Sequence, residues 1–358
     1  MTTPLADIIT RRIAQTGPIT LADYMAECLL HPTHGYYTTR DPLGARGDFT
    51  TAPEVSQMFG ELIGLALAEA WLAQGAPSPV TFAELGPGRG TLMADALRAT
   101  KGVAGFHEAI RLHLVEASPT LRARQRAALE SYDVTWCDRI EELPDAPLLL
   151  VANEFFDALP IRQFTRDAKG WRETQVGLKD GALTLGLSQP APIAALDHRL
   201  SDTRAGDIVE TCPASLPIMS DISRRITAHG GTALIIDYGG WHSLGDTFQA
   251  LEAHEMVDPL ARPGAADLTA HVDFEALAQV AKGMGAATGY MEQREMLWHF
   301  GIEQRASSLA TGKDDAEAAV IEAAFLRLTS ETEMGTLFKA LAISATPQTL
   351  PLGFRPTS

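Results

Sequence analysis

Cysteine is scarce in this chain, with three residues among 358, at positions 28, 137 and 212, and no C-x-x-C pair. Such widely spaced thiols fit neither a disulfide framework nor a zinc knuckle, and they favour a reducing compartment. His31 and His34 lie three residues apart beside a proline and a glycine. We expect them to line a turn or a pocket, and we predict no metal site.

Long apolar runs are also missing. The apolar segment 147–152 is too short to span a bilayer. The N-terminus has neither the apolar core of a signal peptide nor the basic, acid-poor composition of a mitochondrial presequence. We therefore expect a bacterial, cytoplasmic protein that is not embedded in a membrane.

Positive charge is in deficit: 29 Lys and Arg residues face 45 Asp and Glu residues, for a net charge of −16. Without a basic cluster to neutralise phosphates, the chain is a poor partner for nucleic acid. An acidic surface suits a neutral or basic substrate, such as an arginine- or lysine-bearing protein.

Apolar segments recur at regular intervals and alternate with helical patterns, which predicts an α/β fold with a parallel, Rossmann-like sheet covered by helices on both faces. The expected strands are residues 80–84, 110–116, 132–136, 148–152 and 232–238. Three short strands at about 161–207 read as an antiparallel β insertion. We expect a helical N-terminal region over residues 1–75 and a core over residues 76–358.

A glycine-rich loop follows the first of these strands. The strand ends in Glu84, and Gly86, Gly88 and Gly90 precede a helix. Glycine lets the backbone turn sharply and approach a ligand closely. The dinucleotide fingerprint G-x-G-x-x-G requires a third glycine where this chain has Thr91. The observed E-x-G-x-G-x-G pattern instead resembles motif I of class I S-adenosyl-L-methionine (SAM) methyltransferases.

The next two strands also end in polar residues. Glu116 closes the second strand, where a carboxylate accepts the ribose hydroxyls of an adenosine-containing cofactor. Ser118 then caps a helix. Asp138 follows the third strand and is placed either near the adenine or in an ordinary turn.

The fourth strand runs directly into Asn153, Glu154 and Asp157, which places polar groups at the predicted point of transfer. Two carboxylates grip a guanidinium in bidentate fashion, and methyl transfer depends on such positioning. Glu154 and Asp157 are the first candidates for this clamp, with Glu210 or Asp237 as further candidates.

The segment 34–54 is rich in glycine, proline, aromatic and hydroxyl residues, and loops of this length are usually functional. We expect it to cover the cofactor pocket and to form one wall of the substrate channel. Its candidate residues are Tyr36, Asp48, Thr51 and Glu54.

Taken in order, five segments resemble the MidA family over nearly the whole chain: residues 47–61, 84–90, 153–160, 236–239 and 268–274. The mitochondrial members of that family are complex I assembly methyltransferases. The resemblance implies a class I SAM fold, with SAM as cofactor and S-adenosyl-homocysteine (SAH) as product. It also implies symmetric dimethylation of an arginine in a complex I core subunit. By position, Gly86, Gly88 and Gly90 would hold SAM, and Glu116 its ribose.

Two other functions remain open at this point. An NAD-dependent oxidoreductase is disfavoured by Thr91. A SAM-fold protein that binds a complex I subunit as a chaperone without turnover is disfavoured by the intact set of Glu84, Glu116 and the three glycines.

Overall fold

The computed structural model describes residues 3–39 and 51–357. The chain divides into two compact units, each with its own hydrophobic core. The large unit comprises residues 50–156, 217–239 and 274–358, and the small unit comprises residues 1–49, 157–216 and 240–273.

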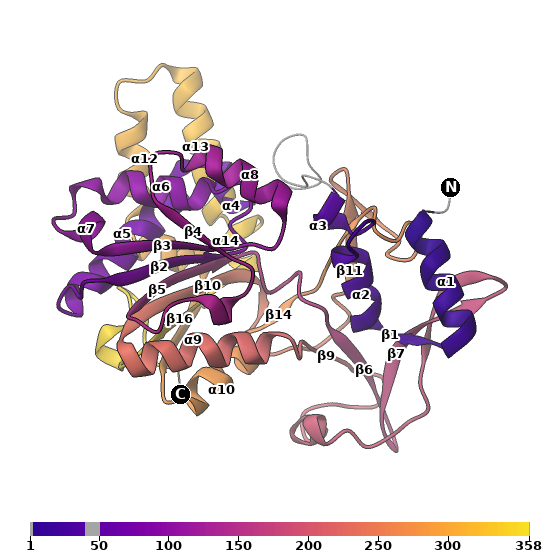
Figure 1. Cartoon of the computed structure of the whole chain (residues 1–358). Coiled ribbons are helices and arrows are strands. Elements are labelled where there is room, and N and C mark those ends of the chain that lie inside the picture. Colours follow the sequence, from indigo (N-terminus) through magenta and orange to yellow (C-terminus); the bar gives the residue numbers. More distant parts are fainter. Residues whose placement is uncertain (1–2, 40–50, 358) are drawn as a thin grey trace. The chain divides into compact units, whose positions relative to one another are not determined.

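A mixed β-sheet forms the centre of the large unit, with strand order β15-β16-β10-β5-β2-β3-β4 (Figure 1). The bounds are β2 Val80–Leu85, β3 Ile110–Val115, β4 Val134–Cys137, β5 Leu148–Asn153, β10 Gly231–Gly240, β15 Ala287–Glu292 and β16 Phe338–Ser344. The neighbours β10, β5, β2, β3 and β4 run parallel. The five predicted strands and the α/β class are thereby confirmed, and the carboxyl ends of these strands meet at one edge.

The predicted parallel arrangement holds for these five strands, and beyond β10 the sheet continues with antiparallel strands. The sequence analysis missed β16, which pairs antiparallel with both β10 and β15. Its sequence, Phe-Lys-Ala-Leu-Ala-Ile-Ser, contains two alanines, and alanine is depleted in strands. The strand is buried nearly throughout, so burial between two neighbours outweighs its weak intrinsic propensity.

Helices cover both faces of this sheet. In Figure 1, α5 (Gln57–Ala73) and α6 (Thr91–Ala99) lie over one face, and α9 (Ser215–His229) and α10 (Phe274–Gly283) lie over the other. Apolar side chains of α5 and α6 share one core with those of β2, β3 and β5. Further helices are α4 Ala52–Val55, α7 Phe106–Ala109, α8 Pro119–Ala128, α11 Gln293–His299, α12 Ile302–Ala310, α13 Asp315–Thr329 and α14 Met334–Leu337.

The small unit is built on an antiparallel sheet in the order β1-β7-β6-β9, with β8 also paired to β7. Its strands are β1 Ile19–Thr20, β6 Arg162–Asp167, β7 Gly170–Lys179, β8 Ala182–Leu187 and β9 Ile208–Thr211. The three strands predicted for the insertion are thus present. The unit also contains α1 Pro4–Thr16, α2 Leu21–Leu30, α3 Tyr36–Thr39 and the short strands β11 Gln249–Glu252, β12 Glu255–Val257 and β13 Asp267–Thr269.

This division of the chain differs from the predicted boundary at residues 75 and 76. Helix α5 packs on α6 and the central sheet, so it belongs to the large unit. The N-terminal helices share a core with β7 of the insertion and with β13, through residues such as Tyr24, Val176 and Leu268. Segments far apart in the sequence build the small unit, which a linear reading of the chain does not reveal.

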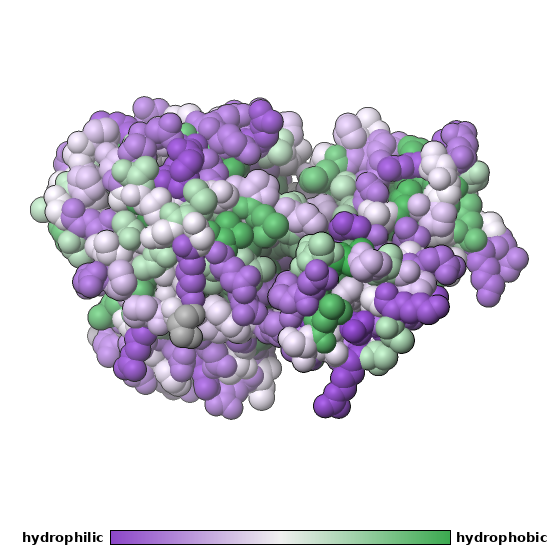
Figure 2. Space-filling model, turned by 90° about the horizontal axis from the view of Figure 1, so that it is seen from below, coloured by the Kyte–Doolittle hydropathy of each residue, from purple (hydrophilic) through white to green (hydrophobic). Residues whose placement is uncertain are grey.

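Hydrophilic residues cover most of the surface visible in Figure 2. The most exposed large hydrophobic residues, Val320 and Met256, lie far apart in the sequence. Isolated apolar residues of this kind are normal on protein surfaces. Within the described ranges, no helix combines the length and the apolar character needed to cross a bilayer.

One buried carboxylate connects three helices of the large unit. Glu61 of α5, 3% exposed, accepts hydrogen bonds from Arg98 of α6 at 2.9 Å and from Arg305 of α12 at 2.7 Å. Burial alone would raise the pKa of Glu61, but the bonds from the two arginines outweigh it and hold the pKa below its usual range. The ionised form of Glu61 therefore anchors α12 to the helix that follows the glycine loop.

Replacing Glu61 with alanine should lower the free energy of unfolding by about 1–3 kcal/mol, the scale of hydrogen bonds to a charged group. The pKa of Glu61 is lower in the folded protein, so this contribution is complete above pH 4.5, the ordinary value, and disappears as the pH falls below it. Urea denaturation at neutral and acidic pH measures both effects. Glu303→Ala, an exposed acid on α12, is the control and should change stability little. A pH-independent difference between wild type and Glu61→Ala would contradict the assignment.

Candidate active site

The glycine loop follows β2 at the carboxyl edge of the sheet. Its backbone has a conformation that only glycine adopts readily. The φ angles of Gly86, Gly88 and Gly90 are 61°, 52° and 83°, in the left-handed region. A Cβ on Gly86 would also lie 2.9 Å from the ring of Phe155. The loop is therefore closely packed against the segment that follows β5.

The short helix α4 contacts both of these loops. Thr91, at the start of α6, donates its hydroxyl to Glu54 Oε1 at 2.5 Å. The backbone N–H of Ala52 donates to Glu154 Oε1 at 2.9 Å. Through these two bonds, α4 lies beside the helix that follows the glycine loop and beside the turn after β5. Its role as a pocket cover stays a prediction.

The carboxylate of Glu116, at the end of β3, is buried and held at both oxygens. Oε1 accepts the backbone N–H of Ser118 at 2.7 Å, and Oε2 accepts the side-chain amide of Gln125 at 3.2 Å. Burial raises the pKa of Glu116, although these bonds oppose the shift. Each carboxylate oxygen has a second lone pair, which can accept one ribose hydroxyl. Ser118 also caps α8 as predicted, since its Oγ accepts the N–H of Leu121.

Glu84, at the end of β2, has a buried carboxylate oxygen that accepts no hydrogen bond from the described residues. Its side chain is 3% exposed, and Oε2 has no hydrogen-bond partner among the described residues. Burial, followed by the negative charge of Glu116, raises the pKa of Glu84 to about 8. A buried acid with an unused acceptor is complementary to a cationic ligand group, and SAM carries an ammonium and a sulfonium.

The segment after β5 has an unusual backbone. Glu154 adopts a φ of 50°, which is uncommon for a residue with a long side chain. Its Oε1 accepts the amide of Asn153 at 3.0 Å, in addition to the N–H of Ala52. The buried carboxylate of Asp237 accepts the N–H groups of Phe155 and Phe156 at 3.2 and 3.0 Å. The turn is therefore fixed from two sides, with Glu154 at its bend.

The side-chain oxygen of Asn153 is a second buried acceptor for which the described residues provide no donor. Its Oδ1 is buried and has no partner within the described parts of the chain, whereas its Nδ2 is bound to Glu154. Since β5 and β2 are neighbours in the sheet, two unused oxygens stand at adjacent strand ends. The glycine loop, these acceptors and Glu116 fit a cofactor with a cationic amino-acid part and a ribose. Thr91, bonded through its side chain, takes the place of the glycine that a pyrophosphate site requires.

Asp138 lies after β4, as the sequence predicted, but its side chain is 71% exposed and paired with Arg122 at 2.6 Å. Its proposed contact with adenine stays a prediction.

The other predicted residues belong to the small unit. Tyr36 is fully buried in that unit's hydrophobic core. The carboxylate of Glu210 is buried and accepts the side-chain amide of Gln163 and the N–H of Thr247, both at 3.0 Å. Asp157 is also buried there. The clamp that joins Asp157 or Glu210 with Glu154 stays a prediction, and Asp48 lies outside the described residues.

Sequence reasoning overlooked two features of this region. One is Gln125, which gives no signal because a single glutamine inside a helix is usually solvated. The other is the bond between Glu54 and Thr91, which joins residues 37 positions apart. The E-x-G-x-G-x-G spacing identified the loop but not the groups that support it.

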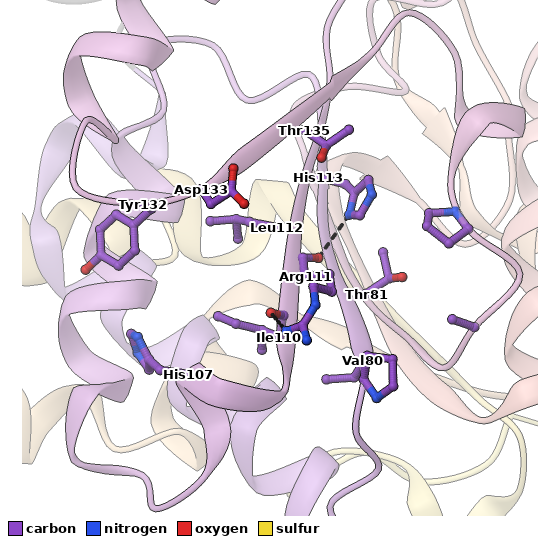
Figure 3. A pocket seen from close by; sticks show the side chains of 13 residues that line it. Val80, Thr81, His107, Ile110, Arg111, Leu112, His113, Tyr132, Asp133 and Thr135 are labelled. Atoms are coloured by element: carbon purple, nitrogen blue, oxygen red, sulfur yellow. Dashed lines mark hydrogen bonds between the residues drawn. The ribbon is translucent and has the colours of Figure 1, made fainter.

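A cavity of about 440 Å³ lies elsewhere in the large unit, lined by Val80, Ile110 and their neighbours (Figure 3). These residues begin β2 and β3, so the cavity opens at the amino ends of the strands, opposite the glycine loop. Two of its polar side chains bond to the protein itself: Arg111 Nη1 donates to the Ile110 carbonyl at 2.8 Å, and His113 Nδ1 lies 3.0 Å from the Arg111 carbonyl. We do not assign methyl transfer to this cavity.

The chain resembles known proteins over most of its length. Residues 62–291 match the model of a family described as S-adenosyl-L-methionine-dependent methyltransferases. The chain is 37% identical to the mitochondrial protein arginine methyltransferase NDUFAF7 of Danio rerio, over 94% of this chain and 85% of that protein. It is 37% identical to the human NDUFAF7, over 85% of this chain and 74% of that protein.

A solved structure agrees with these relatives. A Burkholderia thailandensis protein bound to S-adenosyl-homocysteine superposes with a TM-score of 0.83 at 32% identity. The match covers 95% of this chain and 91% of that one. The fold, SAM as the cofactor and the methyltransferase class are thereby established.

We predict that binding of SAH depends on pH through Glu84. The bound ammonium favours the carboxylate form, whereas the free site holds the proton up to a pH of about 8. Binding at pH 7 should therefore release a proton, and affinity should rise by up to about tenfold per pH unit until it levels off above pH 8. Isothermal titration in buffers of different ionisation enthalpy counts the protons.

Glu84→Gln is the matched variant, because it keeps the shape and cannot ionise. The titration of the ligand's own amino group is common to both proteins, so the difference between them isolates Glu84. Equal proton release by wild type and variant would remove Glu84 from the cofactor site.

Proposed function

Because the chain belongs to the MidA-like family of S-adenosyl-L-methionine-dependent methyltransferases, we propose that it methylates an arginine side chain of a protein. The observation that carries the proposal is the acidic turn at the end of β5, where the half-buried Glu154 lies next to the glycine loop. The curated relatives support it, since they are named protein arginine methyltransferases.

The chemistry explains why an acid is needed there. A guanidine nitrogen would attack the methyl carbon as the carbon–sulfur bond breaks and its electron pair stays on the sulfur of SAH. The proton that the nitrogen loses would pass to the neighbouring carboxylate. A guanidinium is a poor nucleophile because its charge is delocalised, and a carboxylate that grips it concentrates electron density on the attacking nitrogen. Glu154 follows β5 directly, which makes it our first candidate for this role.

The finer part of the proposal concerns the substrate. The MidA resemblance suggests an arginine in a core subunit of complex I, its symmetric dimethylation and a role in the assembly of that complex. A reducing cytosol, suggested by the three unpaired cysteines, is the proposed location. The net charge of −16 is favourable for binding a basic segment of such a subunit.

The second candidate function, a SAM-binding chaperone without turnover, makes a different prediction. Incubation of the protein with SAM and a purified complex I core subunit, followed by mass spectrometry of the peptides, should find one or two added methyl groups on one arginine. Binding of the subunit with no gain in mass would favour the chaperone. Methylation of a lysine or a glutamine instead would refute the arginine assignment.

Glu154→Gln should reduce methyl transfer by at least about a hundredfold, because the neutral amide cannot bind and polarise a guanidinium. Its oxygen can still accept the N–H of Ala52, so affinity for SAH should change little. Turnover and SAH titration are measured on the same preparation. Glu130→Gln, an exposed acid after α8, is the control. Near-normal turnover of Glu154→Gln would disprove the clamp and move attention to Asp157 and Glu210.

A further inference from the structure

Gln125 is a fully buried glutamine in a helix whose other long polar side chains are arginines. It lies on α8 with a relative exposure of 0%, whereas Arg124 and Arg126 of the same helix are exposed. A buried amide destabilises a protein unless its polar atoms find partners. The partners of Gln125 therefore indicate why the residue is there.

Every partner of Gln125 lies on or next to the cofactor site. Its Nε2 donates to the carbonyl of Gly88 at 2.8 Å and to Glu116 Oε2 at 3.2 Å. Its Oε1 accepts the indole N–H of Trp136, on β4, at 2.9 Å. An indole only donates and a carboxylate only accepts, so these partners fix which end of the amide faces which neighbour.

The helix backbone is pressed against the same loop. A Cβ added to Gly90 would lie 3.5 Å from Gln125 Cα and 3.6 Å from Ala128 Cβ. The glycine loop and the acid of β3 thus share one support, which is α8. A movement of the Gln125 side chain would affect both.

We propose that Gln125 is a positioning residue for the ribose of SAM, acting through Glu116. The Ser118 N–H holds one carboxylate oxygen and the Gln125 amide holds the other. Both oxygens are thereby oriented to accept the two ribose hydroxyls. The second N–H of the same amide fixes the Gly88 carbonyl, so ribose recognition and loop geometry are set together. This role goes beyond the proposed function and does not depend on which substrate is methylated.

The test is a double-mutant cycle on SAH affinity, measured by isothermal titration. Gln125→Met keeps the volume and removes the amide, and it should raise the Kd of SAH roughly tenfold or more, as expected for loss of a hydrogen bond to a charged group. In a Glu116→Ala background the same substitution should raise the Kd by a clearly smaller factor, because only the bond from Gln125 to the Gly88 carbonyl remains to be lost. If Gln125→Met raised the Kd of SAH by the same factor in the wild type and in Glu116→Ala, the role of Gln125 would be merely structural and the proposal would be overturned.

Two further variants keep the test decisive. Gln74→Met is the matched control: this glutamine bonds to Thr232 and Gly231 at the amino end of β10, so its loss should lower stability without changing the Kd. If Gln125→Met does not fold, Trp136→Phe removes the indole N–H that orients the amide and keeps an aromatic ring at this position. It should weaken SAH binding a few-fold, again only while Glu116 is present. Unchanged affinity in Trp136→Phe together with additivity would refute the role.

Discussion

The site depends on one constraint: carboxylates must be buried at the strand ends and still have acceptors left for a cationic ligand. Glu84 and Glu116 meet this constraint in opposite ways. Glu116 is held by two hydrogen bonds, whereas Glu84 keeps an oxygen without a partner among the described residues. Burial, and then the negative charge of Glu116, raise the pKa of Glu84. A ligand that brings positive charge relieves this repulsion, which water cannot do in so enclosed a place.

The surrounding helices hold the glycine loop and these carboxylates in position. Helix α8 supports the glycine loop and Glu116 through one glutamine, and α4 joins that loop to the turn after β5 through Glu54 and the Ala52 N–H. The glycine loop is the most pliable part of the site, because three of its residues have no side chain. Its geometry is therefore imposed from outside, by hydrogen bonds from neighbouring segments.

The sequence alone predicted what depends on local pattern. The five parallel strands, the loop at Gly86–Gly90 and the placement of Glu116 follow from periodicity and spacing over short ranges. It did not predict β16, whose position depends on burial between two partners, nor the small unit, whose core joins residues such as Leu5, Val176 and Leu268. Gln125 was missed for the same reason, since its importance lies in three contacts on other elements.

The backbone of Glu154 is the strongest structural argument for chemistry at the end of β5. A φ of 50° is strained by roughly 1 kcal/mol for a residue with a Cβ, and glycine or asparagine would adopt it more easily. The strain is maintained by Asp237, which binds the following two N–H groups, and by Ala52, which binds the carboxylate itself. A long acidic side chain held at such a position agrees with our proposal that its charge serves at the carboxyl edge. A guanidinium substrate beside a methyl donor would need such a charge.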